Sequence, residues 1–467
     1  MKRTKHLAII STLFVLIFAL AACSSGNGNS QPSPSPAASN ESTEPATAET
    51  EQPSEEPAPV EEEKYDLGGR EILFSAWWDG TPNADTPEGE RALERQKEVE
   101  AKYNVKIKYV NQDYHQTAEK LSSTVMAGKP FADVVLVPDY LIAGLLQGGY
   151  FTALDDFMDV RTESKMPDEV IDAGSYQTSK AYGFNKSLAL FDNTGMYYNK
   201  RIFEEAGVPT PAEAQDQGTW NWDTFIDYAK KLTVDTNGDG KPDQWGIAAA
   251  PNVLGLSLIY SNDTMAFDEK TKKFLLDSPN AIEGLDMMSK LYNEYKVVKR
   301  NEGNDWEDPA KYFKEGQAAM YPGGIWEAGS RLQNQMKDEY VFVHFPQGPK
   351  AKGFKVGMSQ FHMNFIPKGV ENPKAVYKIW EDLQDWNIEQ SDREWAETYF
   401  LNEESINNAL ATLSIMEFGR YNAYNFEENY NPLANDIAAG KITAATGVAQ
   451  IMPVLQAKVD KFGQDSK

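Results

Sequence analysis

Aromatic rings and carboxylates occur together directly after three short apolar segments in the first part of the chain. The groups are Trp77-Trp78-Asp79, Asp113-Tyr114 and Pro138-Asp139-Tyr140. Aromatic faces stack on the C–H faces of sugar rings, while carboxylates accept hydrogen bonds from hydroxyl groups. Core packing explains any single ring equally well, but the repetition at three successive positions favours a surface that binds a polar ligand.

The segment Asp235–Asp243, with the sequence DTNGDGKPD, has the spacing of an EF-hand-like calcium loop. Oxygen side chains fall at loop positions 1, 3, 5 and 9, and a glycine falls at position 6, where the turn is sharp. The predicted ligands are Asp235, Asn237, Asp239, Asp243 and the backbone carbonyl of Lys241. Position 12 is Gly246, so the usual bidentate Glu is missing and water, Gln244 or a distant carboxylate would complete the shell. We expect weak structural calcium binding, at ~10⁻⁴–10⁻³ M; an Asx-rich turn without an ion is the alternative.

Residue types typical of catalytic centres are scarce. The 467 residues include four histidines and one cysteine, and the motifs H-E-x-x-H, G-x-S-x-G, G-x-G-x-x-G and the P-loop are missing. Among 70 acidic residues a carboxylate pair suited to glycoside hydrolysis would always be found, so it carries no information. A lone histidine such as His115 or His362 is more often a satisfied polar residue than a catalyst. The net charge of −25 removes any general attraction for nucleic-acid phosphate.

We therefore predict that the chain is not an enzyme and has neither catalytic residues nor a catalytic cofactor. A secreted polysaccharide-degrading hydrolase or lyase is one alternative, and a surface carbohydrate-binding adhesin is the other. Release of reducing sugar would identify the former, and ligand-induced closure would distinguish a two-lobed binder from an adhesin.

The elements that would position the aromatic groups alternate between strands and helices. Strands are predicted at 71–77, 104–110 and 132–137, with a helix over 88–103 after the first. Further helices begin at Ser278-Pro279 and Asn372-Pro373, where a capping residue precedes proline. Strands separated by helices predict α/β architecture with parallel sheets, and such sheets bind ligands beyond the carboxyl ends of their strands.

The first 22 residues have the features of a secretion signal. A basic start precedes the uncharged run 7–22, which is shorter than a membrane-spanning helix requires. The run ends Leu20-Ala21-Ala22-Cys23, which resembles the lipobox of bacterial lipoproteins, where cleavage precedes the cysteine and its sulfur carries the lipid. Cys23, the only cysteine, is therefore the predicted lipidation site, palmitate included. A plain signal peptide with an incidental cysteine is the alternative.

Residues 23–64 have a composition that cannot form a core. The segment is rich in Ser, Pro and Glu and contains no aromatic residue, so it cannot bury enough apolar surface to offset its ordering entropy. We predict a disordered tether that holds a folded domain away from the membrane to which Cys23 is anchored.

Five segments of the foldable part follow the order of motifs in a known family. FADVVLV within 131–154, GMYYNKRIFEEAGVP at 195–209, TWNWDTFIDYAKKLT at 219–233 and FKEGQAAMYPGGIW at 313–326 resemble motifs of bacterial extracellular solute-binding proteins, family 1. Residues 375–383 fit the helix that follows. The resemblance covers most of residues 70–385, and the C-terminal part matches only loosely.

This resemblance implies a two-lobed periplasmic-binding-protein-like fold of type II. Each lobe would be a mostly parallel sheet flanked by helices, with the ligand cleft between the lobes. The N-terminal lobe would comprise 65–192 plus about 350–390, and the C-terminal lobe 193–349 plus about 391–467. Segments crossing between the lobes would lie near 188–196, 345–354 and 385–399.

The resemblance also implies a function and partners. The protein would capture a carbohydrate, in particular an oligosaccharide, by lobe closure and deliver it to the membrane permease of an ABC transporter. It would be a monomer on the extracellular face of a Gram-positive cell membrane, anchored only through its N-terminal lipid.

The predicted ligand-binding residues combine the strand-end groups with the family's cleft positions. Trp326 is favoured most, because its family counterpart stacks on sugar. The full set is Trp77, Trp78, Asp79, Tyr114, Asp139, Tyr140, Asp192, Asn193, Trp326, Glu327, Met358 and Ser359.

Overall fold

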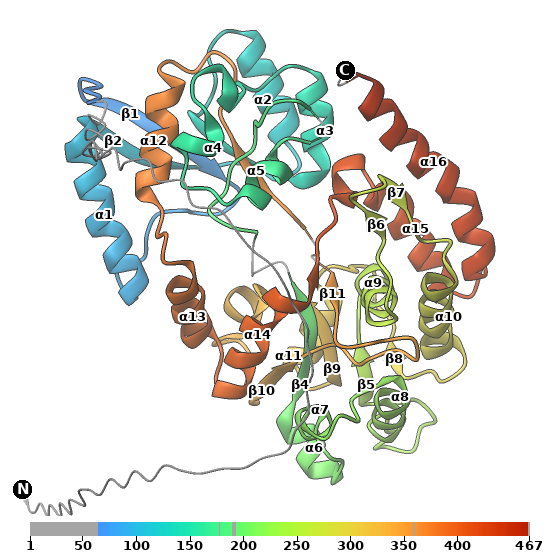
Figure 1. Cartoon of the computed structure of the whole chain (residues 1–467). Helices are drawn as coiled ribbons and strands as arrows, with labels where there is room; N and C mark the ends of the chain where they lie inside the picture. Colours follow the sequence, from blue (N-terminus) through green and yellow to red (C-terminus); the bar gives the residue numbers. More distant parts are fainter. Residues whose placement is uncertain (1–63, 177, 189–192, 358–359, 466–467) are drawn as a thin grey trace, which may run out of the picture. The chain divides into compact units, whose positions relative to one another are not determined.

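A computed structural model describes residues 64–176, 178–188, 193–357 and 360–465. Within these ranges the chain alternates helices and strands that form two separate main sheets (Figure 1). None of the helices in these ranges is long and apolar enough to cross a membrane. The predicted signal segment and Cys23 lie outside the described residues, as does the tether except for its last residue.

The first sheet has the strand order β12-β3-β1-β2. Its strands are β1 (Arg70–Ala76), β2 (Val105–Asn111), β3 (Val134–Val137) and β12 (Met363–Phe365). β1 pairs in parallel with both β2 and β3, whereas β12 returns from far along the chain and pairs antiparallel with β3. The three predicted strands are thus confirmed to within two residues, and the carboxyl ends of β1, β2 and β3 point to one edge of the sheet.

The second sheet has the order β10-β4-β9-β5-β8. Its strands are β4 (Thr194–Asn199), β5 (Trp245–Ala248), β8 (Val298–Lys299), β9 (Ala318–Gly324) and β10 (Tyr340–Val343). β5 is parallel to β8 and β9, but β4 is antiparallel to β9 and β10. The pairing is thus parallel at β5 and antiparallel at β4. The preceding described helix along the chain is α5 (Asp168–Gly174), which accompanies the first sheet, so the rule for strand–helix–strand units within one sheet does not govern the direction of β4.

Two short ribbons complete the strands of the described residues. β6 (Phe267–Asp268) pairs antiparallel with β7 (Lys273–Phe274), and β11 (Val356–Gly357) pairs in parallel with β13 (Met416–Glu417). The second ribbon joins segments about sixty residues apart and places the chain beyond β13 beside the second sheet's helices.

Helices cover both sheets. Those that accompany the first sheet are α1 (Pro87–Tyr103), α2 (Thr117–Met126), α3 (Asp139–Gln147), α4 (Val160–Glu163), α5 (Asp168–Gly174) and α12 (Pro373–Leu383), with a 3₁₀ turn η1 (Leu154–Asp156). Figure 1 shows α1 beside α12, and the two helices are in contact. The predicted helix 88–103 is confirmed as α1.

The remaining helices lie C-terminal to β4 in the sequence. They are α6 (Lys200–Ala206), α7 (Pro211–Asp216), α8 (Trp222–Lys231), α9 (Pro251–Ser261), α10 (Pro279–Asn293), α11 (Asp308–Lys314), α13 (Ile388–Tyr399), α14 (Glu403–Ile415), α15 (Glu427–Ala438) and α16 (Ala444–Asp465). A π-helical turn η2 (Ala328–Leu332) follows β9, and a 3₁₀ turn η3 (Tyr421–Tyr424) precedes α15. α9, α10 and α15 pack against one another, and their apolar faces form part of the main core.

The two predicted proline-started helices begin differently. Ser278 caps α10 as predicted, with its hydroxyl accepting from the N–H of Ala281 at 3.3 Å. Asn372 precedes α12 but makes no capping hydrogen bond, because its backbone is left-handed at φ +52°. A capping residue needs an extended backbone to turn its side chain onto the first free N–H groups. The capping prediction is therefore wrong for Asn372, although the helix itself is confirmed.

Candidate functional site

Aromatic side chains from three strand ends meet at the edge of the first sheet. The ring of Trp77, which follows β1, lies 5.0 Å from that of Tyr114, which follows β2. Tyr114 in turn lies 5.7 Å from Tyr140, in the first turn of α3 after β3. The parallel strands thus bring together the residues that the sequence predicted to converge. We call Trp77, Trp78, Tyr114, Tyr140 and His362 the first-sheet aromatic cluster.

His362 is the member of this cluster that the sequence analysis considered as a lone histidine but did not include among the predicted ligand-binding residues. It precedes β12, and its ring lies 4.7 Å from that of Trp77. Its Nδ1 accepts from the backbone N–H of Asp139 at 3.1 Å, so Nε2 carries the proton and donates to Oε1 of Gln360 at 3.0 Å. Burial lowers the pKa of His362, which keeps this imidazole neutral.

The carboxylates of the strand ends differ in their exposure. Asp139 is buried, and its side chain accepts from the backbone N–H groups of Tyr140 at 2.8 Å and Phe361 at 3.2 Å. It therefore holds the start of α3 against the segment before β12. Asp79 is exposed, and hydrogen bonds from the side chain and backbone of Thr81 lower its pKa. Trp78 is also exposed, at 51%, and its ring lies 5.1 Å from that of Trp77.

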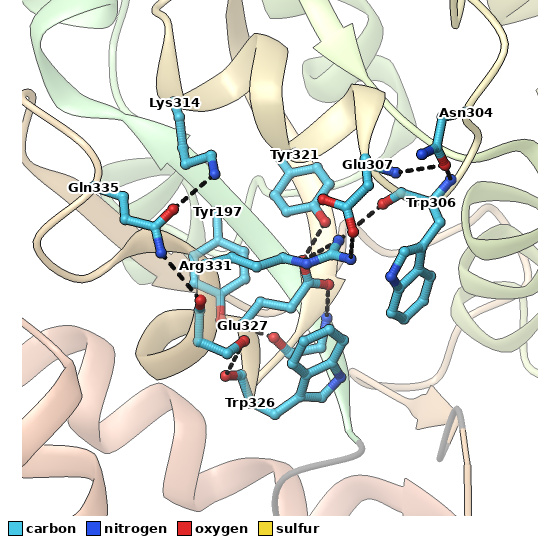
Figure 2. Close-up of polar contacts among 12 residues, drawn as sticks. Tyr197, Asn304, Trp306, Glu307, Lys314, Tyr321, Trp326, Glu327, Arg331 and Gln335 are labelled. Atoms are coloured by element: carbon cyan, nitrogen blue, oxygen red, sulfur yellow. Dashed lines mark hydrogen bonds and ion pairs between the residues drawn. The ribbon is translucent and has the colours of Figure 1, made fainter. Parts of the chain in front are cut away.

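The other predicted group, Trp326 and Glu327, follows the central strand β9 of the second sheet. The indole of Trp326 stacks on that of Trp306, with ring centroids 5.6 Å apart and planes at 19°. The guanidinium of Arg331 lies 4.3 Å from the Trp306 ring and 5.2 Å from the Trp326 ring, which is cation–π geometry. Figure 2 shows the two indoles beside this arginine.

Glu327 holds this arrangement in place. Its Oε2 accepts from the hydroxyl of Tyr321 and from Nη1 of Arg331, the latter at 3.3 Å, and its Oε1 accepts from the N–H of Gly324 at 3.1 Å (Figure 2). Burial raises the pKa of Glu327, and the charge of Arg331 opposes that shift. Glu327 is thus a positioning residue that fixes Arg331 and the end of β9, and its predicted ligand contact stays untested.

Gly324 leaves room for the Trp326 side chain. A Cβ atom at this position would lie 2.6 Å from the indole Nε1 and 2.8 Å from Cδ1, which is closer than nonbonded carbon atoms approach. The glycine at the end of β9 therefore allows the indole to fold back against the strand end.

Trp326, Glu327 and Trp306 line a cavity of about 240 Å³. Its other walls come from α9, the β11 region and the start of α15, and its rings include Tyr260, Tyr421, Phe426 and Tyr430. The residues from 421 onward are functional candidates that sequence reasoning missed, because the family motifs end before them. Their only sequence signal is the aromatic-rich stretch YNAYNFEENY at 421–430.

Gln360 connects the cavity to the first-sheet aromatic cluster. It lines the cavity and also accepts the hydrogen bond from His362. Among the described residues, Gln360 therefore borders both the first-sheet aromatic cluster and the cavity that Trp326 and Trp306 line. A ligand that enters the cavity would meet Trp326 from the second sheet and reach toward Gln360, next to the first.

Asn193, a predicted ligand-binding residue, is held by hydrogen bonds within the protein. It is fully buried beside β4, its Nδ2 donates to Oγ1 of Thr412 at 3.1 Å, and its carbonyl accepts from the N–H of Ile325 at 2.9 Å. Asp192, Met358 and Ser359 were also predicted to bind ligand, and they lie outside the described residues. Cys23, the predicted lipidation site, lies outside them as well.

The predicted calcium loop connects α8 to β5 and is closed by a bridge between Val234 and Gln244. Oδ1 and Oδ2 of Asp235 accept from the N–H groups of Gly238 and Gly240 at 2.6 and 2.8 Å. Asp243 accepts from Thr236, which lowers its pKa. The described residues contain no group of three or more His, Cys, Asp or Glu side chains arranged to hold a metal. The loop therefore has the turns of a calcium site while its carboxylates bind backbone N–H groups, and calcium binding stays a prediction.

Comparison with known proteins identifies the family to which the motifs of this sequence belong. The family model for bacterial extracellular solute-binding proteins matches residues 83–380. Binding proteins from Brucella abortus and Brucella suis are 23% identical over 284 residues, which is 59% of this chain and 64% of theirs. The chain therefore spans less than two thirds of the length of these relatives.

Solved structures of the same architecture extend over nearly the whole described part. The maltose/maltodextrin-binding domain MalE from Bdellovibrio bacteriovorus, bound to maltotriose, is 16% identical with a TM-score of 0.58 over 84% of this chain and 99% of that one. A substrate-binding protein from Listeria monocytogenes in complex with cycloalternan is 18% identical with a TM-score of 0.59, over 85% and 98%. UgpB from Mycobacterium tuberculosis, in complex with glycerophosphocholine, is 16% identical with a TM-score of 0.61, over 84% and 99%. The predicted type II periplasmic-binding-protein-like fold is confirmed.

Proposed function

The chain belongs to the bacterial extracellular solute-binding protein family, and we propose that its solute is a carbohydrate, specifically an oligosaccharide. The observation that carries this proposal is the pair of aromatic surfaces that border Gln360, one at the first sheet and one at Trp326 and Trp306. Flat rings with adjacent carboxylates and amides suit the apolar faces and hydroxyl edges of successive sugar units. The maltotriose and cycloalternan complexes of the same fold support this choice, while the glycerophosphocholine complex means that the fold alone does not decide the solute.

Capture would proceed by closure of two lobes. We assign residues 65–192 with about 350–390 to one lobe, and 193–349 with about 391–467 to the other. A ligand that contacts Trp326 on one lobe and the first-sheet aromatic cluster on the other stabilises the closed state and shifts the population toward it. We expect an affinity on the order of micromolar, or about −8 kcal/mol.

Delivery would follow from the position of the protein at the cell surface. Lipid on Cys23 and the Pro-rich segment up to residue 64 would keep the folded part close to the membrane permease of an ABC transporter, as a monomer on the extracellular face of a Gram-positive cell. Calcium in the loop Asp235–Asp243 would be structural and would take no part in ligand contact.

The test is a titration of the full chain and a Trp326→Ala variant with maltotriose, cellotriose and mannotriose. We expect wild type to bind at least one of them, and Trp326→Ala to lose at least about tenfold in affinity because the stacking ring is gone. Trp326→Phe keeps a ring and should recover part of the loss. Trp245→Ala, at a half-buried tryptophan at the start of β5 that does not line the cavity, is the matched control and should bind like wild type.

Two results would contradict the proposal. Unchanged affinity in Trp326→Ala, with an unaltered circular dichroism spectrum, would remove Trp326 from the site. Release of reducing sugar during incubation with polysaccharides would instead indicate a hydrolase.

A further inference from the structure

One wall of the cavity beside Trp326 is built from a polar stripe on α15. Glu427, Asn431 and Asn435 follow one another at four-residue spacing, and all three line the cavity. Residues four apart lie on the same face of a helix. Asn435 also brings in a second carboxylate, because its Nδ2 donates to Oδ2 of Asp305 at 3.0 Å, and Asp305 lines the same cavity.

Both carboxylates in this wall are hydrogen-bonded to amides. Glu427 accepts from Nδ2 of Asn422 at 3.0 Å, and Oδ1 of Asp305 accepts from Nδ2 of Asn301 at 2.8 Å. An amide donor satisfies part of a carboxylate's hydrogen-bonding capacity and supplies no positive charge to neutralise it.

Two cations at or beside the cavity are paired with other carboxylates. Lys355 lines the cavity, but its Nζ pairs with Asp263 at 3.0 Å and Glu417 at 2.7 Å. Arg331, behind the two indoles, pairs with Glu307 at 3.1 Å and with Glu327 at 3.3 Å. Within the described residues, the charges of Glu427 and Asp305 therefore have no cation of the protein paired with them.

Other groups of this wall also favour a ligand that donates hydrogen bonds. Oδ1 of Asn431 is buried and has no hydrogen-bond partner among the described residues, and the hydroxyl of the fully buried Tyr430 is likewise unpaired and can donate or accept. An unsatisfied buried acceptor is destabilising until a donor reaches it. The rings of Tyr421, Phe426 and Tyr430 pack on one another beside it, and aromatic faces attract cations.

We propose that the cavity binds an oligosaccharide that carries protonated amino groups, with Glu427 and Asp305, about two helical turns apart along this wall, as separate counter-charges for amines on different sugar units and Asn431 as a further acceptor. This inference rests on the proposed carbohydrate function and narrows it from oligosaccharides in general to those that carry a cationic nitrogen. The stacking surface of Trp326 and Trp306 would hold a sugar ring to which one of these amines is attached. A charge-assisted hydrogen bond to a carboxylate is stronger than one between neutral groups, so the amine gains more here than a hydroxyl would.

The test compares three trisaccharides with the same β-1,4-linked backbone that differ only in the substituent at carbon 2. They are the glucosamine trimer with free amines, the N-acetylglucosamine trimer and cellotriose. Calorimetric titration of the full chain at about neutral pH should give an affinity for the amine trimer at least about tenfold above that for the other two.

Variants then test the assigned residues. Glu427→Gln and Asp305→Asn keep the size and the hydrogen-bonding oxygen of each side chain and remove its charge, so each should lower the affinity for the amine trimer about tenfold and leave any affinity for cellotriose unchanged. Glu428→Gln is the matched control, because Glu428 is the next residue of α15 and pairs with Lys458 on the surface at 2.9 Å. It should bind all three trisaccharides like wild type.

Three results would contradict the inference, the assignment of Glu427 or the proposed function. If the amine trimer binds no tighter than the other two, the inference is wrong, and binding of the N-acetyl trimer or cellotriose would leave the carbohydrate function intact. Loss of binding in Glu428→Gln to the same extent as in Glu427→Gln would overturn the assignment of Glu427, since a general effect of charge would then account for both. If neither these trisaccharides nor maltotriose and mannotriose bind, the proposed function fails together with the inference.

Discussion

Glu427 is a carboxylic acid enclosed by aromatic rings, and its protonation should be visible in stability. Burial raises its pKa from 4.5 to about 7, the neighbouring charge of Asp139 adds to the shift, and the hydrogen bond from Asn422 opposes it. The folded state thus holds the proton more tightly than the unfolded state. The associated stability is present at low pH and is lost as the pH rises from about 4.5 to about 7.

Removing the charge should restore that stability. We expect Glu427→Gln to match wild type at about pH 4.5, and to exceed its free energy of unfolding by on the order of 3 kcal/mol at about pH 8. Urea denaturation at both pH values measures the difference. Glu428→Gln should show no such gain, because Glu428 is exposed and its ion pair with Lys458 lowers its pKa. A Glu427→Gln variant that gains nothing at the higher pH would mean that Glu427 is ionised without penalty in its cavity.

At the residue scale, the sequence predicted the side chains that follow strand ends, but it did not place His362 in the binding set and it missed Glu427. Trp77, Tyr114 and Tyr140 come together because parallel strands end at one edge, and that rule applies to any α/β sequence. His362 and Glu427 join them through an antiparallel strand and through α15, more than 200 residues later in the chain. Such pairings depend on the tertiary fold, and no local spacing encodes them.

At the scale of elements, the loop between α8 and β5 gives a direct test of calcium binding. Gly240 has φ +84°, which the sharp turn of such a loop requires and which other residues rarely adopt. Calcium would replace backbone N–H groups as the partner of Asp235 and Asp239 and join α8 to β5 more firmly. We expect millimolar calcium to raise the melting temperature relative to chelator, and Asp239→Asn to abolish the rise.

The control for this experiment is magnesium at the same concentration. Magnesium demands a smaller octahedral shell than this flexible loop provides, so it should have little effect. Equal melting temperatures in calcium and in chelator would show that the segment is an Asx-rich turn without an ion.

The existence of elements was easier to predict than their ends and their partners. α1 was predicted from side chains that recur at helical spacing, and α10 from such a recurrence after the capping residue Ser278. The cap at Asn372 failed because the backbone there is left-handed, which the residue type does not reveal. The sequence also did not predict that β4 runs antiparallel to β9, because the direction of a strand depends on the tertiary fold and not on its own residues.

At the scale of the whole molecule, Arg420 joins segments that are far apart in the sequence. Its Nη1 donates to the carbonyl of Ala173 in α5 at 2.7 Å, and its Nη2 pairs with Glu269 next to β6 at 2.8 Å. Its guanidinium also lies 5.2 Å from the ring of Tyr176. α5 belongs to the part of the chain around the first sheet, because Gly174 accepts from Gly183 and the adjacent Phe184 pairs with Asn364 in β12.

The ion pair of Arg420 and Glu269 should behave as a coupled unit. Burial pushes the pKa of Glu269 upward, but the hydrogen bonds and charge of Arg420 outweigh it and lower the pKa to about 2. Among the described residues, removing the arginine alone leaves Lys272 as the cationic partner of a largely buried carboxylate, so we expect Arg420→Met to lower the free energy of unfolding by on the order of 3 kcal/mol. The double variant Arg420→Met with Glu269→Gln should recover part of that loss, because the unpaired charge is gone.

Denaturant unfolding of the four proteins of this double-mutant cycle measures the coupling. Arg393→Met is the matched control, since its ion pairs with Glu397 and Glu403 are exposed and should contribute less than about 1 kcal/mol. Strictly additive effects of the two substitutions would show that Arg420 stabilises the protein through its carbonyl contacts with α5 alone. Coupling on the order of 1 kcal/mol or more would instead establish that the charge pair itself holds the β6 region to α5.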